Sequence, residues 1–272
     1  MTPAPRSPGI TLLGLPYDGN SSFLRGAAQA PPLIREALYS PSSNLFTEHG
    51  LDLGTPGRIV DASDLELSDE PGPLAPVRQA VAELLDQDAR LISLGGDHSV
   101  TYPVLQAYGG KYKDLTVLHL DAHPDLYDEL DGNRYSHGCP FARVMEEGLI
   151  GRLIQVGIRT LNTHQSEQIE RFGVEIYELC HWTAPPELAI DGPLYLSVDL
   201  DVFDPAFAPG ISHHEPGGLS PRDVIHIIQN IPAPLVGADI VEFNPTRDPL
   251  GITAMLAAKL LKEIAGRMLE SS

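Results

Sequence analysis

The stretch LHLDAHPDLYDE, Leu118–Glu129, places carboxylate and imidazole side chains directly after an apolar run. Asp121, His123 and Asp125 are spaced i, i+2, i+4, so in an extended chain their side chains lie on one side. Buried carboxylates at this spacing are unfavourable unless a cation compensates them. Oxygen ligands with some imidazole suit Mn²⁺ or a related divalent ion. We therefore expect a metal site here, and the alternative is a solvated acidic loop.

Two other polar clusters also follow apolar runs. In SLGGDHSV, His98 follows a Gly-Gly pair and opens an expected helix, and the alternative is a tight turn capped by Asp97. In LSVDLDVFDP, Asp199 and Asp201 are again two residues apart. The glycine and the terminal glutamate of an EF-hand are missing. Asp204 is out of phase with the pair, so we expect it to form a turn or support the ligands.

Together the three clusters supply two imidazoles and four carboxylates: His98, Asp121, His123, Asp125, Asp199 and Asp201. One divalent ion would be over-supplied by this set, whereas two ions would be neutralised by the carboxylates. Two ions roughly 3.5–4 Å apart can share a water and generate hydroxide near neutral pH. The set therefore predicts a binuclear hydrolytic centre.

Elements that could position these residues alternate along the whole chain. Expected strands are Ile10–Leu15, Arg58–Asp61, Leu91–Leu94, Thr116–Leu120, Leu153–Gly157, Val174–Glu178, Leu194–Val198 and Val236–Val241. Expected helices are Pro32–Leu38, Leu74–Gln87, Ser99–Ala107, Phe141–Glu147, Gln165–Phe172, Pro221–Asn230 and Ile252–Leu269. Ser220 before Pro221, and Thr253, are the expected helix-start signals. Short continuous apolar strands that alternate with helices indicate an α/β domain with a mainly parallel sheet covered on both faces. In such sheets the ligand site lies beyond the carboxyl ends of the strands.

The length, composition and charge of the chain limit the classes of protein to which it can belong. The 272 residues, 42% of them hydrophobic, show no repeat or linker, so we expect one domain over residues 1–272. The net charge of −19 argues against binding to nucleic acid. No apolar run has membrane-spanning length, and the N-terminal residues carry no continuous apolar signal segment. We therefore expect a soluble, cytoplasmic protein that does not bind membranes.

The motifs GGDHS, DAHPD and SVDLDVFDPAFAPG together resemble those of the arginase/agmatinase family of ureohydrolases. The resemblance extends from GLPYDGNSSF to VEFNPTRD, which is nearly the whole chain. It implies a three-layer α/β/α sandwich and a trimer or hexamer. It also implies two Mn²⁺ ions per subunit, which Ni²⁺ or Co²⁺ could replace, and a small cationic guanidinium substrate. The six residues named above match the family's metal ligands motif by motif, and Asp125 is also counted with the catalytic residues.

The resemblance assigns two further catalytic residues. His137 in RYSHGCPF matches the family's loop histidine, which is proposed to pass a proton to the leaving amine. Glu242 at the end of GADIVEFNP matches the family's guanidinium-binding glutamate, and a carboxylate can bind guanidinium in a bidentate fork. The alternatives are a surface histidine and a structural acid. Asp239, earlier on the same expected strand, is out of phase with a pocket and is expected to be structural.

The motifs are most similar to those of plant-type arginases, which predicts hydrolysis of L-arginine to L-ornithine and urea. The segment Leu126–Ser136 is placed to bind the amino-acid head group, with Asn133 and Ser136 as neutral donors and Asp128 or Asp131 as amine acceptors. Agmatinases usually carry GTPEPGG where this chain has SHHEPGG, Ser212–Gly218. His213 and His214 therefore either reach the substrate's tail or are loop residues, and His213 is the candidate contact.

Four other functions stay open at this point. Agmatinase and guanidino-acid or guanidine hydrolases share the metal chemistry and differ only in substrate. A single-zinc deacetylase has a related fold, but the duplicated aspartates and His98 argue against it. A non-enzymatic, metal-dependent scaffold is disfavoured because such proteins usually lose ligands, and here none is missing.

Overall fold

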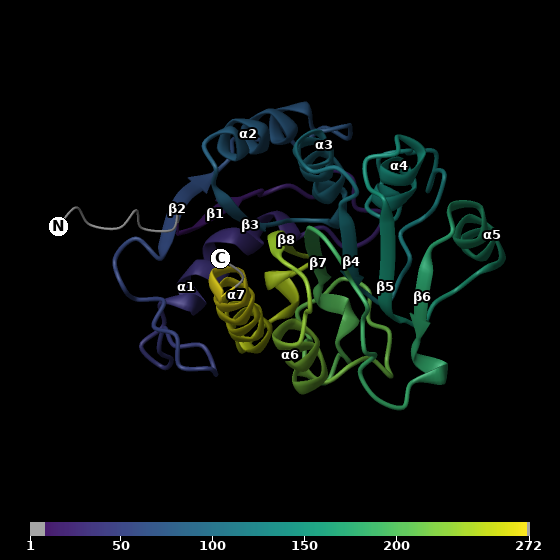
Figure 1. Ribbon diagram of the computed structural model, residues 1–272. Coiled ribbons are helices and arrows are strands. Elements are labelled where there is room, and N and C mark those ends of the chain that lie inside the picture. The colour runs from purple at the N-terminus through teal and green to yellow at the C-terminus, as the bar shows by residue number, and fades with distance from the viewer. Residues whose placement is uncertain (1–8, 271–272) are drawn as a thin grey trace.

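The computed structural model describes residues 9–270, and its centre is one all-parallel sheet (Figure 1). The sheet has eight strands in the order β2-β1-β3-β8-β7-β4-β5-β6. Their bounds are β1 Ile10–Gly14, β2 Ile59–Asp64, β3 Arg90–Leu94, β4 Thr116–Leu120, β5 Arg152–Ile158, β6 Glu175–Glu178, β7 Leu194–Asp199 and β8 Leu235–Val241. Every strand expected from the sequence is present, and only the ends differ by a few residues, which is where such predictions are least reliable.

The helices also agree with the sequence expectation. They are α1 Ala30–Leu38, α2 Ala75–Asp86, α3 Thr101–Lys111, α4 Pro140–Glu146, α5 Thr163–Phe172, α6 Pro221–Gln229 and α7 Ile252–Glu270. Two 3₁₀ turns matter for the site, η2 His98–Val100 and η4 Leu200–Val202. No helix among residues 9–270 is both long enough and apolar enough to cross a bilayer.

One of the two expected helix-start signals is confirmed. The Ser220 side chain accepts from the Asp223 backbone N–H, and the Asp223 carboxylate accepts from the Ser220 backbone N–H, which makes a capping box. The expectation for Thr253 is wrong, because α7 already begins at Ile252. The N–H of Ala254 instead donates to Asp248 Oδ2 at 2.9 Å, so the aspartate side chain satisfies the first turn of α7.

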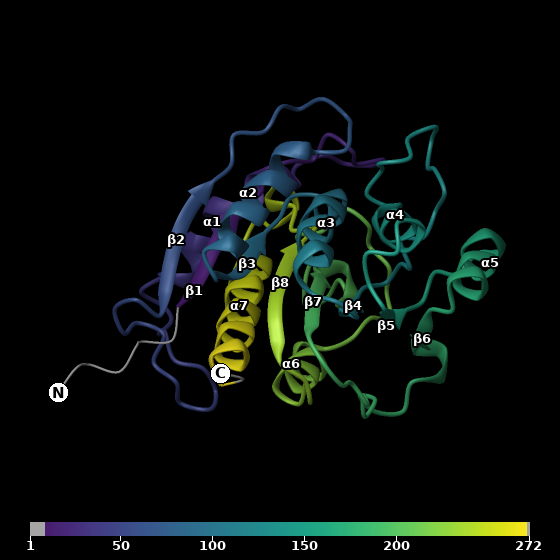
Figure 2. The same ribbon diagram turned by 45° about the horizontal axis from the view of Figure 1, so that its top comes forward.

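The sheet is covered on both faces, which confirms the three-layer sandwich. Figure 1 shows α2, α3 and α4 on one side of the sheet and α1, α6 and α7 on the other. Strand β7 shows how the layers are specified. Leu194, Leu196 and Val198 belong to the core on the α1/α6/α7 side, whereas Tyr195 belongs to the core on the other side. The longest helix, α7, packs against β8, β1 and β3 (Figure 2).

The strand order brings the polar clusters together. Strands β3, β8, β7 and β4 are consecutive in the sheet although they are far apart in the chain. All of them run parallel, so their carboxyl ends lie at one edge of the sheet. That edge carries the residues that follow each of these strands.

Candidate metal centre

The turn after β3 places His98 in the interior. The backbone of Gly96 passes so close to Tyr17 that an added Cβ would lie 1.7 Å from the Tyr17 carbonyl oxygen, so only glycine fits there. Asp97 caps η2 by accepting from the Ser99 N–H at 3.1 Å, as the sequence alternative proposed. His98, the first residue of η2, is fully buried.

Nδ1 of His98 faces three carboxylates and no donor. It lies 3.0 Å from Asp125 Oδ2 and 3.2 Å from both Asp121 Oδ2 and Asp199 Oδ2. Among the described residues this buried nitrogen has no partner with hydrogen-bond geometry. An orphaned nitrogen surrounded by carboxylate oxygens fits a cation as the missing partner.

A second group of ligands shares Asp121. Nδ1 of His123 lies 3.0 Å from Asp201 Oδ2 and 3.4 Å from Asp121 Oδ1. Asp121 therefore faces His98 with one oxygen and His123 with the other. The six expected ligands thus converge into two adjacent groups bridged by one carboxylate.

The backbone conformation that brings these ligands together differs from the one predicted from the sequence. Strand β4 ends at Leu120, and Asp125 adopts a left-handed conformation with φ 53°. The expectation that an extended chain aligns Asp121, His123 and Asp125 is therefore wrong, although the side chains do converge. Glu242 after β8 is also left-handed, with φ 62°. Such conformations are costly for residues other than glycine and concentrate at functional sites.

Without a cation the carboxylates disfavour one another's charge. Burial and the nearby Asp121 raise the pKa of Asp125 to about 6. Burial, followed by repulsion from Asp201 and Asp121, raises the pKa of Asp199 well above its usual range. A divalent ion would reverse these shifts because it favours the ionised carboxylates. The donor set of oxygen and imidazole therefore fits hard or borderline divalent ions.

His119 belongs to the site and was not predicted from the sequence. Its ring is fully buried, and the Gln155 amide donates to Nδ1 at 3.0 Å. Nε2 therefore carries the proton and donates to Asp121 Oδ2 at 2.7 Å. Burial lowers the pKa of His119 to about 4, so the ring is neutral. The signal was present, because residue 119 lies two positions before Asp121 and shares its face of the strand.

His137 and Glu242 form a pair beside the ligands. Nδ1 of His137 lies 2.9 Å from Glu242 Oε1, and Nε2 lies 2.8 Å from Ser22 Oγ. The His98 backbone N–H donates to the same Glu242 oxygen at 2.9 Å. Although burial opposes it, the Glu242 charge raises the pKa of His137 to about 9. His137 is thus a protonated imidazolium held at both nitrogens, and Ser22 is a contact that sequence reasoning missed.

A cavity of about 210 Å³ opens onto these groups. Its lining residues are Ser22, His123, Asp125, Tyr127, Leu130, His137, Gly138, Thr160, Gln165, Asp199, Asp201, His213 and Glu242. His213 lies on its wall, with its ring centroid 5.1 Å from that of His137 and 5.6 Å from that of Phe23. His214 does not line the cavity, and its Nε2 lies 3.0 Å from the Pro209 carbonyl oxygen.

The two residues expected to be neutral substrate donors lie outside the cavity lining. Asn133 and Ser136 are not among the residues that line the cavity. Asn133 donates to the Asn20 side chain at 3.1 Å, and Ser136 donates to the Asn20 carbonyl oxygen at 3.3 Å. Their polar groups therefore hold the loop in shape.

The acids expected to accept a substrate amine also lie outside the cavity lining. The Gln168 amide donates to Asp128 at 2.6 Å, and Asp131 is exposed. The lining instead includes the neutral polar side chains of Tyr127, Thr160 and Gln165.

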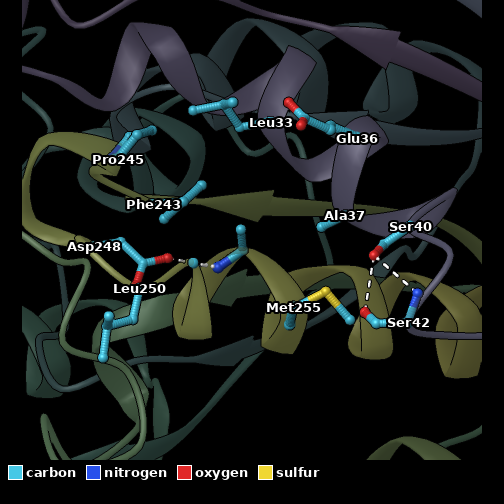
Figure 3. Close-up of a pocket in the computed structure, with 12 residues that line it drawn as sticks. Leu33, Glu36, Ala37, Ser40, Ser42, Phe243, Pro245, Asp248, Leu250 and Met255 are labelled. Carbon is cyan, nitrogen blue, oxygen red and sulfur yellow. Dashed lines mark hydrogen bonds between the residues drawn. The ribbon is translucent and has the colours of Figure 1, made fainter.

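A second cavity, of about 400 Å³, lies between α1 and the start of α7 (Figure 3). Phe243, Met255 and Leu33 form apolar parts of its wall, and Glu36 and Asp248 are its acids. No histidine or cysteine is among the described residues that line it. This larger cavity therefore lacks the donor set of the first, and we assign the chemistry to the smaller one.

Comparisons with known proteins agree with this geometry. A sequence model of the arginase family matches residues 8–266. The chain is 46% identical to the mitochondrial arginase 1 of Arabidopsis thaliana over 275 residues, which covers 95% of this chain and 80% of that protein. It is 34% identical to the proclavaminate amidinohydrolase of Streptomyces clavuligerus, covering 96% of this chain and 88% of that protein. The solved structure of the arginase from Medicago truncatula superimposes with a TM-score of 0.87 at 41% identity, over 96% of this chain and 87% of that one.

Proposed function

The chain belongs to the arginase family of amidine C–N hydrolases, and we propose that it is an arginase that converts L-arginine to L-ornithine and urea. One observation carries this proposal. The buried His/Asp cluster opens onto the same small cavity as the His137–Glu242 pair. That cavity combines a place for cations, an acceptor for a guanidinium and a proton donor.

Two Mn²⁺ ions are the proposed cofactors, with Ni²⁺ or Co²⁺ as possible replacements. His98, Asp121, Asp125 and Asp199 would hold one ion, and Asp121, His123 and Asp201 would hold the other. Bound ions supply the Lewis acidity that makes water a nucleophile near neutral pH. The orphaned Nδ1 of His98 and the mutually repelling carboxylates support this assignment.

The side chains of the pocket would bind the substrate and move its proton. Glu242 lines the cavity, and the N–H groups of His137 and of the His98 backbone both bind its Oε1, so its other oxygen, Oε2, is placed to accept the N–H groups of a guanidinium. Water adds to the guanidinium carbon and the bond from that carbon to the substrate's chain nitrogen breaks. His137 gives its proton to that nitrogen, so the products are urea and a primary amine.

The cavity wall supports an amino-acid substrate. The Thr160 hydroxyl donates to the Ala122 carbonyl, the Gln165 oxygen accepts from the Leu126 N–H, and the Tyr127 hydroxyl accepts from Asn162. The Tyr127 hydroxyl proton, the Gln165 amide N–H groups and the Thr160 oxygen are left for a substrate, and they suit both charges of a zwitterionic head group. Beyond the ligand acids and Glu242, no carboxylate is among the described residues that line this cavity. The single amine of agmatine would therefore gain no counter-ion there. His213, on the same wall, is the proposed contact with the substrate's tail.

Urea release tests the substrate directly. The Mn²⁺-loaded protein would be given L-arginine, agmatine, 4-guanidinobutyrate and free guanidine at matched concentrations. We expect kcat/KM to be highest for L-arginine. A preference for agmatine or a guanidino acid would agree with the proposed metal chemistry but would contradict L-arginine as the substrate. Loss of urea release from all four, in a folded and metal-loaded protein, would overturn the function itself.

We also propose a homotrimer or homohexamer in the cytoplasm. Exposed apolar side chains, including Leu250 at 80% and Phe207 at 43% exposure, support contacts between copies. Light scattering coupled to size exclusion would measure the assembly, and a monomer would contradict it. Cell fractionation would test the compartment, since the plant relatives are named for mitochondria and chloroplasts.

A further inference from the structure

Ser22 lines the catalytic cavity, and its hydroxyl contacts the ring of His137. We propose that this hydroxyl relays the proton of His137 to the leaving nitrogen of the substrate, which makes Ser22 a further catalytic residue. This relay rests on the proposed function, in which His137 is the proton donor. It is supported by the contacts at the two ring nitrogens of His137 and by the way in which the backbone around Ser22 is held.

One ring nitrogen of His137 is committed to Glu242. Nδ1 lies 2.9 Å from Glu242 Oε1, and the His98 backbone N–H donates to the same oxygen at 2.9 Å. An oxygen that already accepts one N–H acts as an acceptor, so Nδ1 keeps its proton and directs it at Glu242. The proton that leaves His137 is therefore the one on Nε2.

The other ring nitrogen is bound by Ser22. Nε2 lies 2.8 Å from Ser22 Oγ, and no other protein group among residues 9–270 hydrogen-bonds this hydroxyl. A hydroxyl accepts from the N–H of an imidazolium and donates to the bare nitrogen of a neutral imidazole. The contact therefore persists before and after His137 gives up its proton, and the remaining hydrogen-bonding capacity of the hydroxyl is left for a substrate nitrogen.

The relay leaves Ser22 chemically unchanged. Its oxygen takes the proton from Nε2 while its own proton passes to the substrate's chain nitrogen, and the bond from the guanidinium carbon to that nitrogen breaks. The ring of His137 loses one proton and becomes neutral, and the leaving amine gains one. Ser22 is exposed, so solvent can return a proton to Nε2 through the same hydroxyl.

The chain before Ser22 is tied to the backbone of His137. Asn20, which is only 3% exposed, accepts the His137 backbone N–H at 3.1 Å through its carbonyl oxygen. The Asn20 backbone N–H donates to Asp97 Oδ2 at 3.1 Å. The segment that carries Ser22 and the loop that carries His137 are thus held together independently of the contact between their side chains.

The chain after Ser22 is held as well. The Leu24 carbonyl oxygen accepts from Ser212 Oγ at 2.8 Å and from the Asn244 amide at 3.0 Å. Leu24 itself has φ 39°, a conformation that is costly for a residue with a side chain and persists only where the surroundings fix it. Ser22 is therefore positioned from both sides of the loop.

Ser22→Ala removes the relay hydroxyl, and Ser21→Ala is its matched control. Ser21 does not line the cavity, and its hydroxyl donates to Asp97 Oδ2 at 3.1 Å. The single-turnover rate with saturating L-arginine would be measured on the Mn²⁺-loaded proteins, so that product release does not mask the chemical step. We expect Ser22→Ala to be about 10–100-fold slower, which is part of the contribution of acid catalysis, with KM and Mn²⁺ content unchanged. We expect Ser21→Ala to keep the wild-type rate.

Ser22→Thr and mixtures of H₂O and D₂O distinguish a relay from a hydroxyl that only holds the ring. Threonine keeps the hydroxyl, so we expect it to restore most of the rate. Two protons move together in the relay, so the rate of the wild type and of Ser22→Thr should depend on the deuterium fraction along a curve. Ser22→Ala, in which only the His137 proton moves, should give a straight line.

A wild-type rate in Ser22→Ala, equal losses in Ser22→Ala and Ser21→Ala, or no restoration by threonine would overturn the relay. A straight line for the wild type would also overturn it, because only one proton would then be moving. If Ser22→Ala keeps the rate while His137→Asn loses it, the relay alone is wrong. A folded, Mn²⁺-loaded wild type that releases no urea would overturn the proposed function instead.

Discussion

His137 is held at both ring nitrogens by protein groups, and this sets its role among the residues of the site. Its contacts with Glu242 and Ser22 fix the ring at the cavity wall, and the Glu242 charge keeps it protonated. Neither of the side-chain hydrogen bonds of His137 is with a ligand carboxylate. We therefore expect His137 to move protons without holding metal.

Replacement of His137 by Asn separates these two roles. We expect kcat to fall about 10²–10⁴-fold because the proton donor to the leaving amine is lost. The Mn²⁺ content, measured by elemental analysis after gel filtration, should stay at the wild-type value. If the metals leave instead, His137 is a ligand and the proton-donor role is wrong.

The raised pKa of His137 also predicts how the stability of the metal-free protein depends on pH. The pKa is about 9 in the folded chain and 6.5 for an unperturbed histidine. The folded state therefore binds this proton more tightly, and the stabilisation is full below pH 6.5 and is lost as pH rises through 9. Denaturant unfolding of the wild type and His137→Asn should differ by up to about 3 kcal/mol more at pH 6 than at pH 10. A difference that does not change with pH would contradict the pairing with Glu242.

Asp125→Ala should abolish turnover because it weakens the binding of the metal ion near His98. The variant should still fold, because burial and the Asp121 charge make the ionised Asp125 unfavourable in the metal-free protein. Metal content per chain and the melting temperature of the metal-free variant would be measured together. Full activity, or a metal-free variant that no longer folds, would contradict the assignment.

At the scale of elements, strand ends and helix starts position the site. His98 opens η2 after β3, Asp121 directly follows β4 and Asp199 ends β7, so each of these three ligands lies at the end of a regular element. Helix α6 follows the loop that carries His213, and its start is fixed by the capping box of Ser220. The cap therefore stabilises the far end of that loop.

Ser220→Ala should lower the free energy of unfolding by about 1 kcal/mol, because the cap supplies an acceptor for a helix N–H that otherwise has none. Ser166→Ala is the control, since that serine is a half-buried residue inside α5 that caps no helix N–H, and its hydroxyl only donates to the Asn162 carbonyl oxygen. Urea unfolding would compare the two. Equal losses would show that the effect comes from removing any serine rather than from the cap.

At the scale of the whole molecule, metal and fold are linked. Four buried carboxylates crowd one edge of the sheet, and burial raises the pKa of three of them, Asp125, Asp199 and Asp201, without metal. Ions that bind this edge only in the folded state stabilise the fold by mass action. Metal removal should thus lower stability without abolishing the fold, because the two apolar cores do not depend on it.

Mn²⁺ at about 100 times its dissociation constant should stabilise the protein by about 2.7 kcal/mol per site. The melting temperature, measured by calorimetry, should rise by roughly 5 °C or more for a chain of this size. The rise in melting temperature with Mn²⁺ should be smaller for Asp125→Ala. For the wild type with Mg²⁺ it should be smaller still, because Mg²⁺ prefers to keep its bound waters. No shift with Mn²⁺ would contradict metal binding at this site.

The sequence by itself determined the strands, the helices and the identity of the six candidate ligands. These features are local, because side-chain periodicity and the residues at strand ends follow from neighbours in the chain. The resemblance in motifs added His137 and Glu242. The alternation in LHLD would also have placed His119 beside Asp121, had it been applied to a polar residue inside an apolar strand.

Only the tertiary structure decided how these residues meet. The order β3-β8-β7-β4 differs from the chain order and brings Glu242 next to the backbone of His98 and Ser197 opposite Asp239. The tertiary structure also places Asn133 and Ser136 so that both side chains donate hydrogen bonds to Asn20. Such contacts join residues far apart in the chain. They depend on which strands pair and how loops cross the sheet edge, and no local spacing encodes that choice.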